Sequence, residues 1–523
     1  MAKSIMIQGT MSNAGKSLIA AGLCRIFKQD GYKVAPFKSQ NMALNSYVTS
    51  EGQEMGRAQV VQAMAAGVEP SVRMNPILLK PTTDMGSQVI VQGQVVGNMR
   101  AMDYFAKKKE YIPVIRESYE QLAADHDIIV IEGAGSPAEI NLKQDDIVNM
   151  GMAKIADAPV LLVGDIDRGG VFAQLIGTVM LLEPEEQARI KGLIVNKFRG
   201  DKRILDPGIT MLEKRAGKPV LGVVPYADVD IEDEDSLATS LEETHVQAEI
   251  DVAVIRFPRI SNFTDMQALS MEWDVSVRYV TKPSELGEPD AILLPGTKNT
   301  IQDLLWLRES GLEAKITRLA KKGTIVFGIC GGYQMLGEAL MDPLQTESAL
   351  GSVRGMDLLP VTTVFEEEKQ LENRTYRIGM LDGEFASLSG EKVAGYEIHM
   401  GRTEIAGSNV TSQQSDTKII AGDSVYTMKT TTPIYPFISD SAGNILGYTA
   451  GTVAGSYIHG IFDEVAFREA FIRLLYARKG KTRGESQYLT MQEYREQQFD
   501  KLAQILRESL DMEKIYEILG LCK

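Results

Sequence analysis

The amino-acid sequence predicts an α/β protein with two doubly wound domains and a helical C-terminal tail. The 523 residues are enough for about three domains, or for two large ones. Short apolar runs that end in Gly, Asp or Asn alternate with longer amphipathic stretches, which is the pattern of βα units in a parallel sheet. An acidic stretch precedes a second α/β series. We predict domains over residues 1–230 and 249–475, a linker over 231–248 and a tail over 476–523.

The composition is that of an ordinary globular protein, with 44% hydrophobic and 24% charged residues. The net charge of −15 argues against nonspecific binding to DNA or RNA. We find no uncharged apolar stretch of the roughly 18 residues that a membrane span needs, and we expect no signal peptide. Cys24, Cys330 and Cys522 lie far apart, which favours a reduced compartment. We therefore expect a cytoplasmic protein that binds neither nucleic acid nor membrane.

In the first domain, five apolar runs predict strands with helices between them. Two of these helices are marked by apolar residues that recur three and four positions apart, over residues 16–29 and 51–66. The predicted strands cover residues 4–7, 127–132, 160–165, 192–196 and 220–224.

The acidic stretch, residues 228–243, holds eight Asp or Glu and no Lys or Arg, so we interpret it as a solvated connector. From Asp463 onward the chain is expected to be helical, with Thr490 and Glu493 spaced as a capping box. We expect this tail to pack against a domain or to form a contact in a homo-oligomer. The second α/β series predicts strands over residues 249–256, 291–295 and 324–329, and a β-rich region over 354–457.

A phosphate-binding loop follows the first predicted strand, with the sequence Gly9-Thr-Met-Ser-Asn-Ala-Gly15-Lys16-Ser17. Glycines let backbone N–H groups surround phosphate oxygens, a lysine reaches the β and γ phosphates, and a serine hydroxyl suits Mg²⁺. The loop is one residue longer than the usual form, because Thr10 stands where a glycine is ordinary. In this it resembles dethiobiotin synthetase and the deviant P-loop group that includes MinD-type ATPases. We assign Gly9, Thr10, Gly15, Lys16 and Ser17 to ATP binding.

Further residues extend the predicted nucleotide site. Glu132 ends an apolar strand beside small residues, and hard oxygen ligands suit Mg²⁺, so we assign Ser17 and Glu132 to the metal. Asn196 also ends a strand and resembles the adenine-side residue of the same P-loop group. Lys38, Asn41 and Arg168 are the predicted contacts to an anionic substrate.

A second motif, Gly328-Ile-Cys330-Gly331-Gly332, stands between a predicted strand and a predicted helix. A nucleophile on such a turn needs small neighbours, and the helix N-terminus lowers the pKa of the thiol. The N–H groups of Gly331 and of Gly296, in another strand-end loop, are the predicted oxyanion hole. This arrangement resembles class I glutamine amidotransferases, which implies L-glutamine as ammonia donor.

A thiol nucleophile needs a base, and the chain has four histidines: His126, His245, His399 and His459. His459 lies in an apolar segment that ends in small residues, so we assign it as the base of Cys330. His399 also sits between glycines, and we expect it to be structural or to face the substrate.

In the class I family a glutamate follows the histidine by two positions, but here that position is Ile461. Glu464, Glu397 and water all stay open as the group that orients His459. The departure matches the cobyrinic/cobyric acid branch of the amidotransferases, which is similar to this chain in joining an N-terminal dethiobiotin-synthetase-like domain to a C-terminal glutaminase domain.

Eight ordered segments resemble the cobyric acid synthases over essentially the whole chain. The resemblance implies amidation of the b, d, e and g carboxylates of adenosylcobyrinic acid a,c-diamide, a corrinoid, with ATP, Mg²⁺ and glutamine and without a prosthetic group. The segments are residues 9–17, 37–45, 74–81, 132–139, 165–172, 294–298, the Cys330 motif and 455–463.

Three other functions stay open. A cobyrinic acid a,c-diamide synthase has the same two modules, but residues 37–45 and 165–172 favour the cobyric branch. A different ATP-dependent glutamine amidotransferase is the second. The third is a MinD-like ATPase switch with a noncatalytic second domain, against which the pair of Cys330 and His459 argues.

Overall fold

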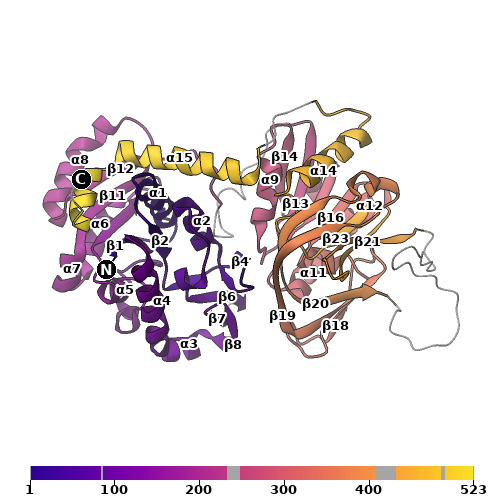
Figure 1. Ribbon diagram of the computed structural model, residues 1–523, viewed down its shortest axis with the longest axis horizontal. Coiled ribbons are helices and arrows are strands. Elements are labelled where there is room, and N and C mark those ends of the chain that lie inside the picture. The colour runs from indigo at the N-terminus through magenta and orange to yellow at the C-terminus, as the bar shows by residue number, and fades with distance from the viewer. Residues whose placement is uncertain (1, 84–85, 233–247, 407–431, 485–488, 522–523) are drawn as a thin grey trace. The chain divides into compact units, whose positions relative to one another are not determined.

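The computed structural model describes residues 2–83, 86–232, 248–406, 432–484 and 489–521 (Figure 1). It divides into two units, and each unit is made of more than one segment of the sequence. The predicted domains are single continuous segments. Unit 1 comprises residues 1–43, 53–232 and 492–523, and unit 2 comprises residues 44–52 and 233–491. Residues 233–247, which include most of the acidic stretch 228–243, lie outside the described residues. Among the described helices, none combines the length and the apolar character that crossing a membrane requires.

Unit 1 is built on a parallel sheet of six strands, in the order β12-β11-β10-β1-β9-β2. All five strands predicted for residues 1–230 are confirmed in this sheet. The sixth strand of the sheet, β2, is a short edge strand that was not predicted, and neither were strands β3 to β8. The strands of the six-stranded sheet are β1 (Lys3–Gly9), β2 (Val34–Phe37), β9 (Ile128–Glu132), β10 (Val160–Asp165), β11 (Ile190–Phe198) and β12 (Val220–Pro225).

Helices cover both faces of this sheet, as alternation along β1 shows. Ile5 and Ile7 belong to a core cluster with helices α1 (Lys16–Gln29) and α2 (Arg57–Ala66). Ser4 points to the opposite face, where its hydroxyl is 2.7 Å from that of Tyr119 on α4 (Ile112–Asp125). Successive side chains of a strand alternate between faces, so β1 is buried on both sides, as a central parallel strand requires. The sheet is therefore doubly wound, as predicted.

The predicted helix over residues 51–66 is correct only from Arg57. The preceding residues form a short strand, β5 (Glu54–Gly56), in which the buried Glu54 accepts a hydrogen bond of 2.8 Å from Lys80 Nζ. A smaller sheet has the order β3-β6-β7-β8, with β3 (Gln40–Met42), β6 (Ile77–Thr83), β7 (Gly86–Val91) and β8 (Gln94–Arg100). The other helices of unit 1 are α3 (Ala101–Lys107), α5 (Met150–Ile155), α6 (Val171–Leu181), α7 (Pro184–Arg189) and α8 (Lys202–Ala216).

The C-terminal tail is helical, and it packs against the N-terminal part of unit 1. Helix α15 (Met491–Ser509) meets α1 where α1 has Gly22, since a Cβ on that glycine would lie 2.3 Å from Leu506 Cδ1. Helix α16 (Met512–Leu519) adds Ile515 and Tyr516 to the same core cluster. The tail was expected either to pack against a domain or to form a contact in a homo-oligomer. The structure shows the first, because the tail packs into the core of unit 1.

Glu232 corrects the interpretation of residues 228–243 as a fully solvated connector. Its carboxylate is buried and forms ion pairs with Arg57 and Arg495. Burial alone would raise the pKa of Glu232, but the two guanidinium groups lower it to about 2. This acidic residue therefore has a structural role in unit 1.

Unit 2 is built on a mixed sheet, with eleven strands among the described residues. The parallel part holds β14 (Val275–Val280), β13 (Ile250–Ile255), β15 (Ala291–Leu294), β16 (Ile325–Ile329) and β23 (Val453–Ser456). The sheet continues through β22 (Ile445–Ala450), β21 (Ile434–Ser439), β19 (Val361–Ile378), β17 (Ala339–Met341) and β18 (Ser352–Arg354), and β20 (Lys392–Ile405) pairs with β19. The strands predicted here are confirmed, and so is the β-rich region.

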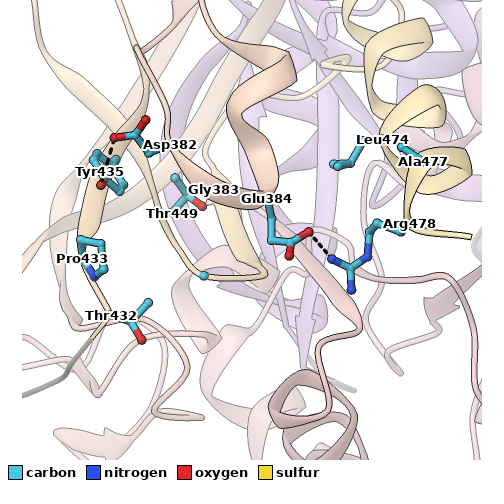
Figure 2. Close-up of a pocket in the computed structure, with 11 residues that line it drawn as sticks. Asp382, Gly383, Glu384, Thr432, Pro433, Tyr435, Thr449, Leu474, Ala477 and Arg478 are labelled. Carbon is cyan, nitrogen blue, oxygen red and sulfur yellow. Dashed lines mark hydrogen bonds and ion pairs between the residues drawn. The ribbon is translucent and has the colours of Figure 1, made fainter. Parts of the chain in front are cut away.

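The helices of unit 2 are α9 (Gln267–Ser270), α10 (Pro283–Leu286), α11 (Thr300–Glu309), α12 (Leu312–Lys321), α13 (Gly331–Met335) and α14 (Val465–Arg478). The unit also takes in strand β4 (Ser46–Val48) from the N-terminal sequence. A pocket of about 700 Å³ lies between residues 382–384, the strands around Tyr435 and the end of α14 (Figure 2). Arg478 and Glu384 form an ion pair there, and neither Cys330 nor His459 lines the pocket.

Candidate active site

Cys330 stands on a strained turn between β16 and α13. Its φ of 52° is in the left-handed region, which is unusual for a residue with a side chain. The glycines around it allow close packing of backbone. A Cβ on Gly328 would lie 2.6 Å from Tyr333 N, and one on Gly332 would lie 2.0 Å from Leu294 O. These contacts explain why small residues must flank the nucleophile.

His459 is held by a carboxylate that sequence reasoning missed. Its Nδ1 lies 2.7 Å from Oδ2 of Asp265, and the same carboxylate accepts a hydrogen bond of 2.9 Å from Gly460 N. Asp265 lies in a 3-10 turn (Phe263–Met266) after β13, with no motif to mark it. Ile461, the position where the class I family has glutamate, is instead buried in the hydrophobic core. Asp265 therefore supplies from another loop the carboxylate that position 461 lacks.

The other ring nitrogen of His459 is not engaged by Asp265. Nε2 is buried and has no hydrogen-bond partner among the described residues. The neighbouring thiol of Cys330 donates to Ile398 O at 3.6 Å and interacts electrostatically with the ring. Burial alone would lower the pKa of His459, but Asp265 and Cys330 raise it to about 10. An imidazole with this pKa stabilises a thiolate beside it. Cys330 and His459 thus lie close enough to interact, and their assignment as nucleophile and base stays a prediction.

The predicted oxyanion-hole residues lie beside this pair. Gly331 directly follows Cys330 and is the first residue of α13. Gly296 lies against the imidazole, since a Cβ there would be 3.1 Å from His459 Cε1 and 3.1 Å from Ser261 O. Both glycines thus lie close to the predicted catalytic pair, and their assignment to an oxyanion hole stays a prediction.

His399 has a different environment. Its Nδ1 lies 2.8 Å from Gly401 O, its Nε2 lies 3.1 Å from a Glu397 oxygen, and its ring stacks on Tyr457 with centroids 3.7 Å apart. Glu397 is therefore engaged with His399 and does not orient His459. Glu464 is the residue that caps α14.

In unit 1 the predicted phosphate-binding loop lies between β1 and α1. Lys16 crosses the loop and donates to Met11 O at 2.9 Å and to Gly135 O at 3.1 Å. Gly9 leaves room for this side chain, because a Cβ there would lie 3.0 Å from the lysine carbons. Gly15 has a φ of 95° and a Cβ on it would lie 2.0 Å from Asn196 Nδ2. Asn196 in turn donates to Ala14 O at 2.9 Å, so it supports the loop.

Glu132 lies at the centre of a buried polar network. It accepts hydrogen bonds from Ser17 Oγ at 2.8 Å, from Lys38 Nζ at 2.9 Å and from Gln62 Nε2 at 2.5 Å. Burial alone would raise the pKa of Glu132, but the Lys38 charge and these bonds lower it below its usual range. The carboxylate is therefore ionised and beside the serine that follows Lys16.

This oxygen pair fits Mg²⁺. The described residues contain no group of three or more His, Cys, Asp or Glu side chains arranged for a metal. Mg²⁺ in nucleotide sites usually takes one or two protein ligands and completes its shell with water and phosphate oxygens. Ser17 and Glu132 are therefore the residues that would hold it.

The remaining predicted residues lie in different surroundings. The Thr10 hydroxyl donates to Gln174 at 3.0 Å. Asn41 is buried and donates to Gln59 at 2.9 Å, whereas Arg168 is exposed in the turn between β10 and α6. Their assignments to ATP and substrate stay predictions.

Comparisons with known proteins match both units. Residues 5–238 match the CobQ/CobB/MinD/ParA nucleotide binding domain, and residues 251–467 match the CobB/CobQ-like glutamine amidotransferase domain. The cobyric acid synthase of Lachnoclostridium phytofermentans is 57% identical over 523 residues, which cover 99% of each chain. That of Ruminiclostridium cellulolyticum is 53% identical over 521 residues, 99% of this chain and 97% of its own. That of Streptococcus sanguinis is 49% identical over 526 residues, 99% of each.

Proposed function

The chain belongs to the cobyric acid synthase family, and from this we infer that it amidates the b, d, e and g carboxylates of adenosylcobyrinic acid a,c-diamide with ATP and glutamine. The observation that carries the proposal is the match to relatives of this name over 99% of the chain, at up to 57% identity. Two complete sets of chemical groups support it. Unit 2 has a nucleophile, a base and a carboxylate, and unit 1 has a phosphate loop with a buried acid.

Unit 2 performs the release of ammonia. Cys330 Sγ, as the thiolate, attacks the side-chain amide carbon of glutamine, and the N–H groups of Gly331 and Gly296 stabilise the oxyanion. Protonated His459 donates its Nε2 proton to the amide nitrogen, so that ammonia leaves and a thioester forms. His459 then takes a proton from the water that hydrolyses the thioester to glutamate. Asp265 holds the ring in place through both steps.

Unit 1 activates the acceptor. The phosphate loop and Lys16 hold ATP so that a substrate carboxylate oxygen attacks the γ phosphorus, which gives an acyl phosphate and ADP. Mg²⁺ held by Ser17 and Glu132 would supply charge neutralisation at the phosphates. Ammonia then attacks the acyl carbon and phosphate leaves. Lys38, Asn41 and Arg168 are the proposed substrate contacts, Asn196 the proposed adenine-side residue, and the cytosol the proposed location.

The test is direct. Purified protein is incubated with Mg-ATP, adenosylcobyrinic acid a,c-diamide and either glutamine or ammonium, and amide gain is followed by mass spectrometry. We expect stepwise gain of four amides, and a Cys330→Ala variant that works with ammonium but not with glutamine. Intact glutamine hydrolysis and ATP hydrolysis without amide gain on this corrinoid would contradict the proposed substrate. Gain of two amides on cobyrinic acid instead would point to the a,c-diamide synthase.

A further inference from the structure

Helix α3 carries an exposed apolar face that has no part in the two sites described above. Met102 and Phe105 lie three residues apart, so they share one face of α3, and Met102 is 80% exposed. Large apolar side chains that gather in contact with water mark binding surfaces. Neighbouring elements contribute others, and together they form what is here called the α3 surface: Met42, Met102, Phe105, Ile140 and Leu142.

Strand β3 borders α3 in unit 1. Tyr104, on the buried face of α3, donates from its hydroxyl to Gln40 Oε1 at 2.6 Å. Met42 follows two residues after Gln40, so it projects from the same face of β3, and it is 59% exposed. The strand begins two residues after Lys38, which donates to Glu132 in the nucleotide site. The α3 surface therefore starts beside the residues that are proposed to contact the substrate carboxylate.

A 3-10 turn, Ile140–Asp145, borders the same stretch of chain. Asp145 forms an ion pair of 2.6 Å with Lys109, which stands four residues after Phe105. Leu142 precedes Asp145 by three residues, and side chains three apart in a 3-10 turn are aligned, so Leu142 faces the same way as Asp145. Apolar side chains from α3, β3 and this turn are thus exposed in one neighbourhood of unit 1.

Basic side chains accompany these apolar ones. Residues 100–109 hold four Lys or Arg and one Asp, in a chain whose net charge is −15. Arg100 directly precedes α3 and Lys107 ends it, and both are exposed. Lys108 Nζ lies 4.4 Å from the centroid of the Phe105 ring, so a cation also adjoins the aromatic member of the surface. An apolar surface with a basic rim fits a ligand that is apolar at its centre and anionic at its edge.

We propose that the α3 surface binds the ring of the corrinoid substrate while one side-chain carboxylate of the ring reaches the nucleotide site. The proposal rests on the proposed function, which supplies the ligand: a largely apolar macrocycle with carboxylates at its periphery. Apolar contact has no fixed direction, and methionine adapts its shape to what it touches. One surface can therefore hold the ring in each of the four orientations that present its b, d, e and g carboxylates in turn.

The experiment measures binding of adenosylcobyrinic acid a,c-diamide to the full-length chain by equilibrium dialysis, read from the absorbance of the corrinoid. The test variant combines Met42→Ser with Met102→Ser, at two positions that lie mostly in solvent, so that folding should be undisturbed. The Kd for the corrinoid should rise about tenfold, because serine offers the ring far less apolar area to cover. The KM for ATP should stay within about twofold of the wild type.

The matched control changes two methionines elsewhere in unit 1. Met180 on α6 and Met211 on α8 are 71% and 57% exposed, close to the values of the tested pair. Met180→Ser combined with Met211→Ser should leave the Kd for the corrinoid as it is in the wild type.

The charge of the rim gives a second readout. Lys107→Glu should weaken binding of the a,c-diamide about fivefold, and should weaken binding of the product with all four amides less, because each amidation removes one carboxylate that the rim attracts. The difference should shrink as salt is added. A merely structural role of Lys107 would change the two Kd values by the same factor and at every salt concentration.

Three results would overturn the proposal: a corrinoid Kd that the Met42 and Met102 substitutions leave unchanged, an equal rise in Kd in the Met180 and Met211 control, or a Lys107→Glu effect that is the same for acid and amide forms. If the Met42 and Met102 substitutions instead convert a dimer into a monomer in sedimentation while the Kd stays the same, the α3 surface belongs to a second copy of this chain.

Failure of the proposed function is a different result. A wild type that neither binds nor amidates the corrinoid contradicts the proposed function and the proposal together. A wild type that binds and amidates it, with an unchanged Kd in the Met42 and Met102 variant, contradicts the proposal alone.

Discussion

Replacement of Asp265 by Asn tests the catalytic arrangement most directly. The variant keeps the size of the side chain and an oxygen for Gly460 N, but removes the negative charge 2.7 Å from His459 Nδ1. A neighbouring carboxylate raises the pKa of a histidine by about one to three units, and each unit is a factor of ten in the protonated population. The pKa of His459 should fall from about 10, and the population of thiolate paired with imidazolium falls with it. We expect kcat for glutamine hydrolysis to fall about 100-fold, with the KM within about threefold.

The assay is glutamine hydrolysis across pH 5 to 10, read as kcat/KM. Activity requires His459 to be protonated beside the thiolate, so its pKa sets the alkaline limb, which should move to lower pH in Asp265→Asn. Glu397→Gln is the matched control, because that buried carboxylate contacts His399 instead, and it should leave the limb in place. The reasoning is refuted if Asp265→Asn retains activity within threefold of the wild type, or if its alkaline limb coincides with that of the wild type.

Three further outcomes can be checked separately. Lys16→Ala should lower ATP-dependent amidation with ammonium at least about 100-fold because charge stabilisation of the phosphates is lost, while glutamine hydrolysis persists; loss of both activities would contradict the division of labour. Glu232→Gln removes the negative charge that pairs with buried Arg57 and partly buried Arg495 and should cost about 3–5 kcal/mol in urea unfolding. Because the pKa of Glu232 is about 2 when folded and 4.5 ordinarily, this stabilisation is present above pH 4.5 and lost as pH falls toward 2, so the wild type alone should show that slope. Iodoacetamide should alkylate Cys330 and spare Cys24, whose burial raises its thiol pKa; equal labelling in the native protein would refute this.

Much of the fold was predictable because its signals are local. The strand ending at Glu132, the phosphate loop and the turn at Cys330 each depend on residues adjacent in sequence, and periodicity or glycine spacing reveals them. Gly328 is an example, since a Cβ there would meet Tyr333 N of the same turn at 2.6 Å. The prediction of a helix over residues 51–66 was wrong at its first residues, because the buried ion pair of Glu54 and Lys80 outweighs the helical periodicity of the sequence.

The parts that could not be predicted depend on contacts distant in sequence. Asp265 lies 194 residues from His459, in a loop with no motif of its own. Glu232 looked solvated because its arginine partners are 175 and 263 residues away. Asn45 belongs to unit 2 through contacts with residues more than 200 positions away, such as Asn262. Each of these features would need an observation of coupled positions, which one sequence does not offer.

The packing of the tail on α1 has a consequence for biosynthesis. The core of unit 1 contains Ile5 from the start of the chain and Leu506 from its end, so no nascent chain can complete it before the tail has been translated. Residues 233–491 are made in between, which takes roughly 10 to 50 seconds at bacterial elongation rates. During that interval the residues of this core that precede residue 233 lack their packing partners from the tail. Unit 1, whose sequence begins first, therefore completes its core only after the tail has been made.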